Sequence, residues 1–178
     1  MRKIVLTYGL IAGAIMSAML AIATPFQDQI GFDRGAILGY TSMVLAFLMI
    51  YFGVRSYRDT VGAGAVTFGR AFLVGLAITL VATTCYVATW EVIYYTVGSD
   101  FTAKYAAHAL ADARASGATE AELAAKAKEM AEFAELYRNP LVNIAFTLLE
   151  PLPVGLPFSL LSAWLLSRRR RVPAMAAT

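Results

Sequence analysis

Apolar residues gather into four long runs along the chain instead of the short stripes expected of a soluble fold. The runs cover residues 4–23, 35–54, 71–95 and 141–167. An α-helix rises 1.5 Å per residue, so a run of about 20 apolar residues crosses roughly 30 Å of hydrocarbon. The pattern predicts an all-α membrane protein with four transmembrane helices.

The segment between the third and fourth runs, residues 99–138, alternates in charge and is too polar to enter lipid. Residues 101–115 predict one helix, Gly117 ends it, and Thr119 with Glu122 forms a capping box that begins a second helix. Apolar residues recur on one face of that second helix: Leu123, Ala127, Met130, Ala134 and Tyr137. We predict an amphipathic helical hairpin whose apolar face covers its own first helix, the ends of the spans or a partner protein.

The fourth run is less regular than the others. Directly after Glu150 it carries four residues that favour a break in a helix: Pro151, Pro153, Gly155 and Pro157. Since proline lacks a backbone donor, a regular helix is not expected to continue through residues 151–157. Either the span begins at Pro151, with residues 141–149 near the surface or against the hairpin, or it is broken at membrane depth.

Basic residues are concentrated at one end of the predicted spans. With the N-terminus in the cytoplasm, nine of the 15 basic residues and one of the 12 acidic residues face the cytoplasm. These basic residues are Arg2, Lys3, Arg55, Arg58, Arg70, Arg168, Arg169, Arg170 and Arg171. Because basic residues beside a span resist translocation, both termini are expected in the cytoplasm and the hairpin on the opposite side. Arg55, Arg58, Arg168 and Arg169 then anchor the spans at the membrane interface.

The arginine run near the C-terminus is interpreted as a stop-transfer anchor, since it lacks the interleaved aromatic residues of a nucleic-acid site. Nucleic acid is therefore not an expected partner. Residues 172–178, beyond the run, are expected to form a disordered tail.

The first apolar run can be interpreted either as a retained span or as a cleavable signal peptide. Its small residues recur every four positions, at Gly9, Gly13, Ser17 and Ala21. Such a stripe lets another helix approach closely, which suits a retained span. The basic start and the pattern Ala21-Ile22-Ala23 also resemble a cleavable signal peptide, although the apolar stretch is long for one.

Three short segments carry a resemblance to a known family. They are residues 52–59 (Phe-Gly-Val-Arg-Ser-Tyr-Arg-Asp), residues 66–72 (Val-Thr-Phe-Gly-Arg-Ala-Phe) and the pair Trp90-Glu91. Together with the third span, they resemble the bacterial membrane family called domain of unknown function 4199, over nearly the whole chain. The resemblance implies a four-span protein of the bacterial inner membrane with its hairpin in the periplasm. It implies no activity.

Two ionisable side chains, Glu91 and Glu150, lie within the apolar runs. Counted from the basic ends along straight helices, they stand at roughly 32 Å and 27 Å, near the outer boundary of the hydrocarbon. Three aromatic residues predict an interfacial belt there: Trp90, Tyr94 and Tyr95. The two acids are either interfacial groups, solvated or paired with a hairpin base such as Arg138, or a paired carboxylate site for a cation or proton.

The remaining chemistry is sparse. His108 has no other histidine or cysteine near it in the sequence, so neither a metal site nor a cofactor is predicted. The motifs H-E-x-x-H, G-x-S-x-G, G-x-G-x-x-G and the P-loop do not occur, so an enzyme is not expected. We expect a structural or interaction protein of the bilayer whose hairpin serves self-association or binds a membrane or periplasmic partner. The alternative is transport of a small solute, ion or proton through Glu91 and Glu150.

Overall fold

The computed structural model describes residues 1–98 and 100–167, and this part of the chain folds into helices joined by short turns. Within it, four helical stretches are long and apolar enough to cross a membrane: Arg2–Ile30, Phe32–Thr60, Phe68–Thr96 and Pro140–Ser167. The predicted fold class, an all-α protein with four candidate spans, is therefore confirmed. Arg168, Arg169 and the predicted tail at residues 172–178 lie outside the described residues.

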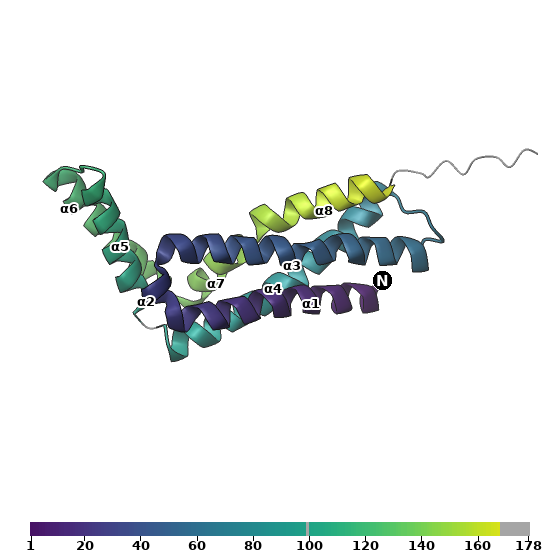
Figure 1. Ribbon diagram of the computed structural model, residues 1–178, viewed down its shortest axis with the longest axis horizontal. Helices are drawn as coiled ribbons and strands as arrows, with labels where there is room; N and C mark the ends of the chain where they lie inside the picture. Colours follow the sequence, from purple (N-terminus) through teal and green to yellow (C-terminus); the bar gives the residue numbers. More distant parts are fainter. Residues whose placement is uncertain (99, 168–178) are drawn as a thin grey trace, which may run out of the picture.

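The helices are arranged as one lengthwise bundle with a hairpin at one end. The first stretch consists of α1 (Arg2–Ala23), a 3-10 turn η1 (Thr24–Phe26) and α2 (Gln27–Ile30). It is followed by α3 (Phe32–Thr60), α4 (Phe68–Thr96), α5 (Phe101–Ala115), α6 (Glu120–Tyr137), α7 (Pro140–Leu149) and α8 (Leu152–Ser167). In Figure 1, α5 and α6 project from one end of the bundle, whereas the N-terminus and the end of α8 lie at the other end.

Small residues of α1 let it pack directly on α4. A Cβ atom added to Gly9 would lie 2.7 Å from Val81 Cβ, and one added to Gly13 would lie 2.7 Å from Cys85 Cβ. The Ser17 hydroxyl donates to the Cys85 carbonyl at 3.3 Å. Because larger side chains would force the two helices apart, the small-residue stripe of α1 serves packing inside this chain.

A second close contact joins α4 to α8, in the half of the bundle away from the hairpin. A Cβ atom on Gly75 would lie 3.1 Å from Ser159 Cβ, and one on Gly155 would lie 2.4 Å from Thr79 Cγ2. The Thr79 and Ser159 hydroxyls lie 3.2 Å apart and share a buried hydrogen bond. We call these four residues the α4–α8 seam. A hydrogen bond between hydroxyls adds directional attraction where lipid offers little hydrophobic drive for association.

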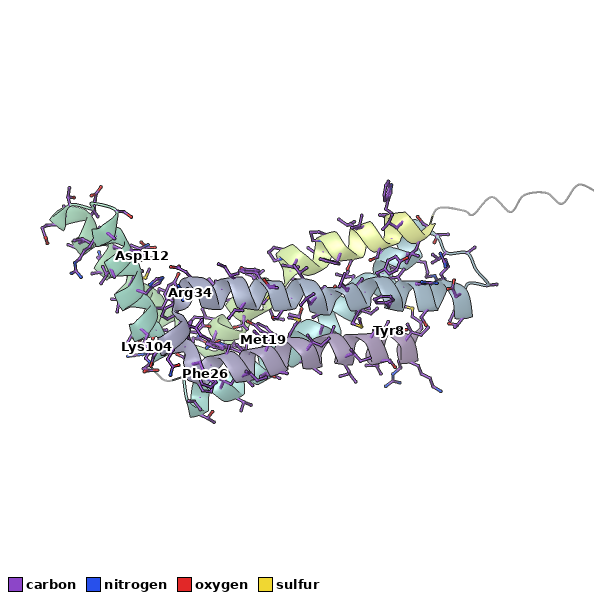
Figure 2. All side chains as sticks on the ribbon, viewed as in Figure 1. Tyr8, Met19, Phe26, Arg34, Lys104 and Asp112 are labelled. Carbon is purple, nitrogen blue, oxygen red and sulfur yellow. The ribbon has the colours of Figure 1, made fainter. Side chains whose placement is uncertain are left out.

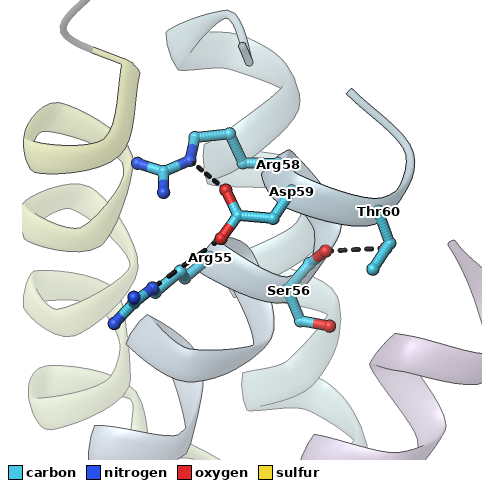
Figure 3. A network of polar contacts seen from close by, with 5 residues as sticks. All are labelled: Arg55, Ser56, Arg58, Asp59 and Thr60. Atoms are coloured by element: carbon cyan, nitrogen blue, oxygen red, sulfur yellow. Dashed lines mark hydrogen bonds and ion pairs between the residues drawn. The ribbon is translucent and has the colours of Figure 1, made fainter. Parts of the chain in front are cut away.

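The last turns of α3 carry the predicted interface anchors Arg55 and Arg58. Arg58 Nε donates to Asp59 Oδ1 at 2.7 Å, and Arg55 Nε lies 3.7 Å from Asp59 Oδ2 (Figure 3). The Thr60 hydroxyl donates to the Ser56 carbonyl at 2.7 Å in the same turn. The two arginines therefore lie together at the end of the bundle that also holds the N-terminus.

The interruption of the fourth stretch is narrower than the expected break over residues 151–157. Only Glu150 and Pro151 separate α7 from α8. Pro153 falls in the first turn of α8, where a backbone donor has no partner within the helix, so it is accommodated there. Pro157 lies inside α8 and removes one helical hydrogen bond without ending the helix. Residues 152–157 therefore lie in a helix and the break falls before them: α8 begins one residue after Pro151, where one of the two expected alternatives started the span.

Both helices of the predicted hairpin form, and so does its capping box. Glu122 N donates to the Thr119 hydroxyl at 3.4 Å, while Thr119 N donates to Glu122 Oε2 at 2.7 Å. Gly117, with φ of +82°, makes the turn between the helices. The buried residues of α6 are Leu123, Met130 and Tyr137. Since α6 packs on α5 and α7, the chain itself covers much of its apolar face.

Candidate functional site

A cavity of about 500 Å³ lies between the hairpin and the adjoining end of the bundle. Its walls come from α1 through α7, and Met19 of α1, labelled in Figure 2, is one of the lining residues. Sites for small molecules usually measure about 300–1,000 Å³ and combine apolar walls with a few polar groups. The cavity has the size and the composition of such a site.

Aromatic rings form much of the wall. Nine of the described lining residues are aromatic: Phe32, Tyr40, Tyr86, Trp90, Phe101, Tyr105, Phe133, Tyr137 and Phe146. We call them the aromatic lining. Trp90 and Phe101 meet edge to face with centroids 4.9 Å apart, and Phe133 meets Phe146 in the same way at 5.7 Å. These contacts connect the hairpin helices to α4 and α7 through rings that also border the cavity.

Glu150 is the one charged side chain among the described residues that line the cavity. It stands at the break between α7 and α8 and is exposed. The buried Tyr86 of α4 donates its hydroxyl hydrogen to Glu150 Oε2 at 3.1 Å. The cavity therefore presents a single carboxylate, held in place by a phenol, within an apolar and aromatic wall.

Glu91 does not join this site. It lies five residues beyond Tyr86 in α4, which is about 7.5 Å along the helix and roughly 140° around it. Glu91 Oε1 is enclosed and has no hydrogen-bond partner among the described residues, and Glu91 is not one of the described lining residues. Arg138 pairs with Glu135 at 2.9 Å. The structure therefore places Glu150 at the cavity and does not bring Glu91 into its lining.

Two residues of the predicted aromatic belt lie inside the protein. Trp90 and Tyr94 are 9% and 8% exposed, whereas Tyr95 is 56% exposed. Trp90 Nε1 lies 3.0 Å from both Tyr137 Oη and Asn143 Oδ1, so the indole joins α4 to α6 and α7. Burial raises the pKa of Tyr137, which keeps its hydroxyl neutral. Trp90 and Tyr94 hold the hairpin to the bundle instead of facing the lipid headgroups.

A second polar cluster connects α5 with the start of α3. His108 Nε2 lies 3.4 Å from Asp33 Oδ1 and 3.2 Å from Asp112 Oδ2, and its ring stacks on Phe32. One ligand atom from each of the three polar residues lies within 4.8 Å of the others, a set that a divalent ion could share. Both carboxylates are exposed, and each lies within ion-pair distance of the imidazole, so the cluster is also explained without a metal ion. Asp33 is distant from His108 in the sequence, so sequence reasoning did not bring them together.

Nearby, Lys104 Nζ lies 2.9 Å from Asp28 Oδ1 in α2. Lys104 and Asp112, both labelled in Figure 2, show that α5 carries these polar contacts along its length. The hairpin is therefore tied to the bundle by charge as well as by aromatic packing.

Sequence reasoning singled out Glu150 but missed Tyr86 and most of the aromatic lining. One signal was present in the hairpin. Phe101 with Tyr105, and Phe133 with Tyr137, are pairs four residues apart, so each pair shares one face of its helix. Tyr86 gave no such signal, because it lies 64 residues from Glu150.

These long apolar helices define a multi-span helical membrane protein. The family model described as protein of unknown function (DUF4199) matches residues 7–168, and the chain belongs to this family. The resemblance found in the sequence is thereby confirmed. No curated protein and no solved structure matches the chain.

Proposed function

We propose that this protein binds a small amphipathic organic molecule in the cavity between the bundle and the hairpin. The observation that carries the proposal is the cavity itself, about 500 Å³ in volume and bordered by side chains of α1 through α7. Apolar walls would bury the carbon skeleton of a ligand, and the few polar groups at Tyr86, Thr147 and Glu150 would orient it. The proposed role is solute binding or transport and is non-catalytic.

This proposal takes up the solute-handling alternative in preference to a hairpin that docks a partner protein. A docking role needs free apolar surface on the hairpin. Among the large apolar side chains described for α5 and α6, Tyr105 and Leu136 are exposed, at 39% and 59%. Tyr105 also lines the cavity. The exposed apolar area of the hairpin is therefore small, and the hairpin is better explained as one wall of a binding site. Self-association stays a prediction.

We further propose that the protein resides in a bacterial inner membrane, with the hairpin in the periplasm and both chain ends in the cytoplasm. The support is the charge of the two ends. The last turns of α3, which carry Arg55 and Arg58, lie at the end of the bundle that also holds the start of α1, where Arg2 and Lys3 stand, opposite the hairpin. Basic residues of this kind are concentrated on the cytoplasmic side of membrane proteins. The cavity would then open toward the periplasmic half of the membrane.

Binding is testable on the full chain in non-ionic detergent with N-phenyl-1-naphthylamine, a neutral apolar dye that accepts energy from tryptophan. The chain has two tryptophans, so Trp164→Phe leaves Trp90 of the cavity wall as the donor. Gly39 lines the cavity, and a Cβ atom there meets nothing within 4 Å, so the side chain of Gly39→Leu would enter the cavity. Gly69→Leu is the matched control, since Gly69 also faces open space but does not line the cavity.

We expect saturable energy transfer from Trp90 to the dye. Gly39→Leu should weaken dye affinity by about tenfold or more, because overpacking a site by a leucine side chain costs about 1–3 kcal/mol. Gly69→Leu should leave the affinity unchanged. Equal affinities in the two leucine variants, or no saturable transfer in the parent protein, would overturn the proposal.

A further inference from the structure

We infer that the ligand of this cavity is a monovalent organic cation, such as a quaternary ammonium or phosphonium with aromatic or alkyl groups. This inference rests on the proposed function and names the class of molecule that the same site selects. It is carried by two features of the lining that occur together, one carboxylate and a wall of aromatic rings.

The charge of the cavity is the first feature. Among the described lining residues Glu150 is acidic and none is basic. In the part of the chain that the structure describes, no lysine, arginine or histidine forms an ion pair with Glu150, and its hydrogen-bond donor is the uncharged Tyr86 hydroxyl. An acid in an apolar wall costs solvation free energy that a phenol offsets only partly. A ligand with one positive charge supplies the missing counter-charge, whereas an anion would be repelled.

The aromatic lining is the second feature. The faces of Trp, Tyr and Phe rings attract cations, and rings arranged around a space are the usual way in which proteins bind quaternary ammonium groups. Tyr137 and Phe146, with centroids 6.3 Å apart, border the cavity together with Glu150. Rings from the hairpin and from the bundle can therefore surround one bulky cation whose charge lies against the carboxylate.

The same features argue against an inorganic ion. Calcium and magnesium take six or more oxygen ligands at short, defined distances, and a single carboxylate in an aromatic wall does not offer them. A space of about 500 Å³ is also far larger than a bare ion requires. The composition fits a cation that carries its own apolar bulk.

Two probes of the same shape and opposite charge test the inference on the full chain in non-ionic detergent. Tetraphenylphosphonium is the cation and tetraphenylborate the anion, and each competes with N-phenyl-1-naphthylamine for energy transfer from Trp90. Glu150→Gln removes the charge and keeps the size of the side chain. Glu91→Gln is the matched control, because Glu91 is the other acid within the apolar runs and does not line the cavity.

We expect the phosphonium to bind at least about tenfold more tightly than the borate, a difference of about 1.4 kcal/mol. Glu150→Gln should weaken phosphonium binding at least tenfold and leave the affinity of the neutral dye nearly unchanged, while Glu91→Gln changes neither. Equal binding of phosphonium and borate to the parent protein overturns the inference without any variant. So does an unchanged phosphonium affinity in Glu150→Gln. If the neutral dye binds and the charge preference is missing, only this inference fails; if no probe binds the parent protein, the proposed function fails with it.

Discussion

The two halves of the helical bundle use glycine in opposite ways. In the α4–α8 seam, added Cβ atoms on Gly75 and Gly155 would lie 3.1 Å and 2.4 Å from neighbouring side chains. In the half next to the hairpin, Gly35 and Gly39 of α3 line the cavity, and added Cβ atoms there meet nothing within 4 Å. Since lipid gives helices little hydrophobic reason to associate, close contact through small residues closes one half. In the other half, Gly35 and Gly39 face open space, and the cavity remains between the helices.

In the half of the bundle next to the hairpin, polar contacts join the helices that border the cavity. Lys104 pairs with Asp28 at 2.9 Å, and Trp90 donates to Asn143 Oδ1 at 3.0 Å. These contacts fix α5 against α2 and α4 against α7. The half next to the hairpin therefore has stabilising contacts of its own, which are separate from the packing that closes the α4–α8 seam.

The largest change in stability is expected from one glycine substitution made in each half of the bundle. Gly155→Ala should lower the free energy of unfolding by about 3 kcal/mol, the upper end of the cost of overpacking, because its Cβ would overlap Thr79 Cγ2. Gly39→Ala should raise it by about 0.5–1 kcal/mol, since alanine is the better helix former and meets no atom there. Unfolding by SDS in mixed micelles measures both. A change of the same sign in the two variants would contradict the comparison.

A smaller effect is expected where the hairpin joins the bundle. Trp90→Phe removes the buried indole donor and leaves Tyr137 Oη and Asn143 Oδ1 without it, at a cost of about 2 kcal/mol. Tyr137→Phe should cost less, because the indole keeps Asn143 as its acceptor. Hydrogen exchange of the backbone amides in α6 and α7 should report the loss, with α8 unaffected. Equal losses of protection in α8 would show that Trp90 supports the bundle as a whole.

The smallest effect concerns the capping box of α6. Thr119→Ala should cost about 1 kcal/mol of helix stability, the typical value of an N-cap. Hydrogen bonds from Thr119 lower the pKa of Glu122 from its ordinary value of 4.5. The contribution of Glu122 to stability is therefore present above pH 4.5 and is lost as the pH falls through the lowered value.

Hydrogen exchange of α6 between pH 7 and pH 3, corrected for the intrinsic rates, measures this dependence. The Glu122→Gln variant should lose it, because glutamine does not titrate in this range. The same pH dependence in the parent protein and in Glu122→Gln would show that Glu122 is not the group responsible.

Features that depend on neighbouring residues were predictable, and features that depend on helix orientation were not. The runs that become α1, α3 and α4 and the capping box at Thr119 are local patterns, and the structure contains them. Gly39 and Gly155, in contrast, look alike in the sequence and have opposite surroundings. Which face of a helix meets another helix is decided by the whole bundle, so the aromatic pairs of the hairpin indicated shared helix faces but nothing in the sequence located the cavity.

Glu150 was identified because a charge in an apolar run is conspicuous on its own. Its partner Tyr86 was missed, since tyrosine is common in membrane helices and the pairing spans 64 residues. Trp90 and Tyr94 were misplaced for a related reason. Aromatic residues near the end of a span suit both the headgroup region and a buried helix contact, and only the position of the hairpin separates the two.

The short connection between the hairpin and the fourth span makes the two mechanically continuous. Arg138 and Asn139 join α6 to α7, and Asn139 Oδ1 accepts a hydrogen bond from Leu141 N at 3.0 Å, which caps the start of α7. The ten residues of α7 form a stiff arm about 15 Å long whose far end is Glu150. Pro151, which has no backbone N–H, follows as the pivot. A tilt of the hairpin would therefore move Glu150, and with it the one charged side chain among the described residues of the cavity lining.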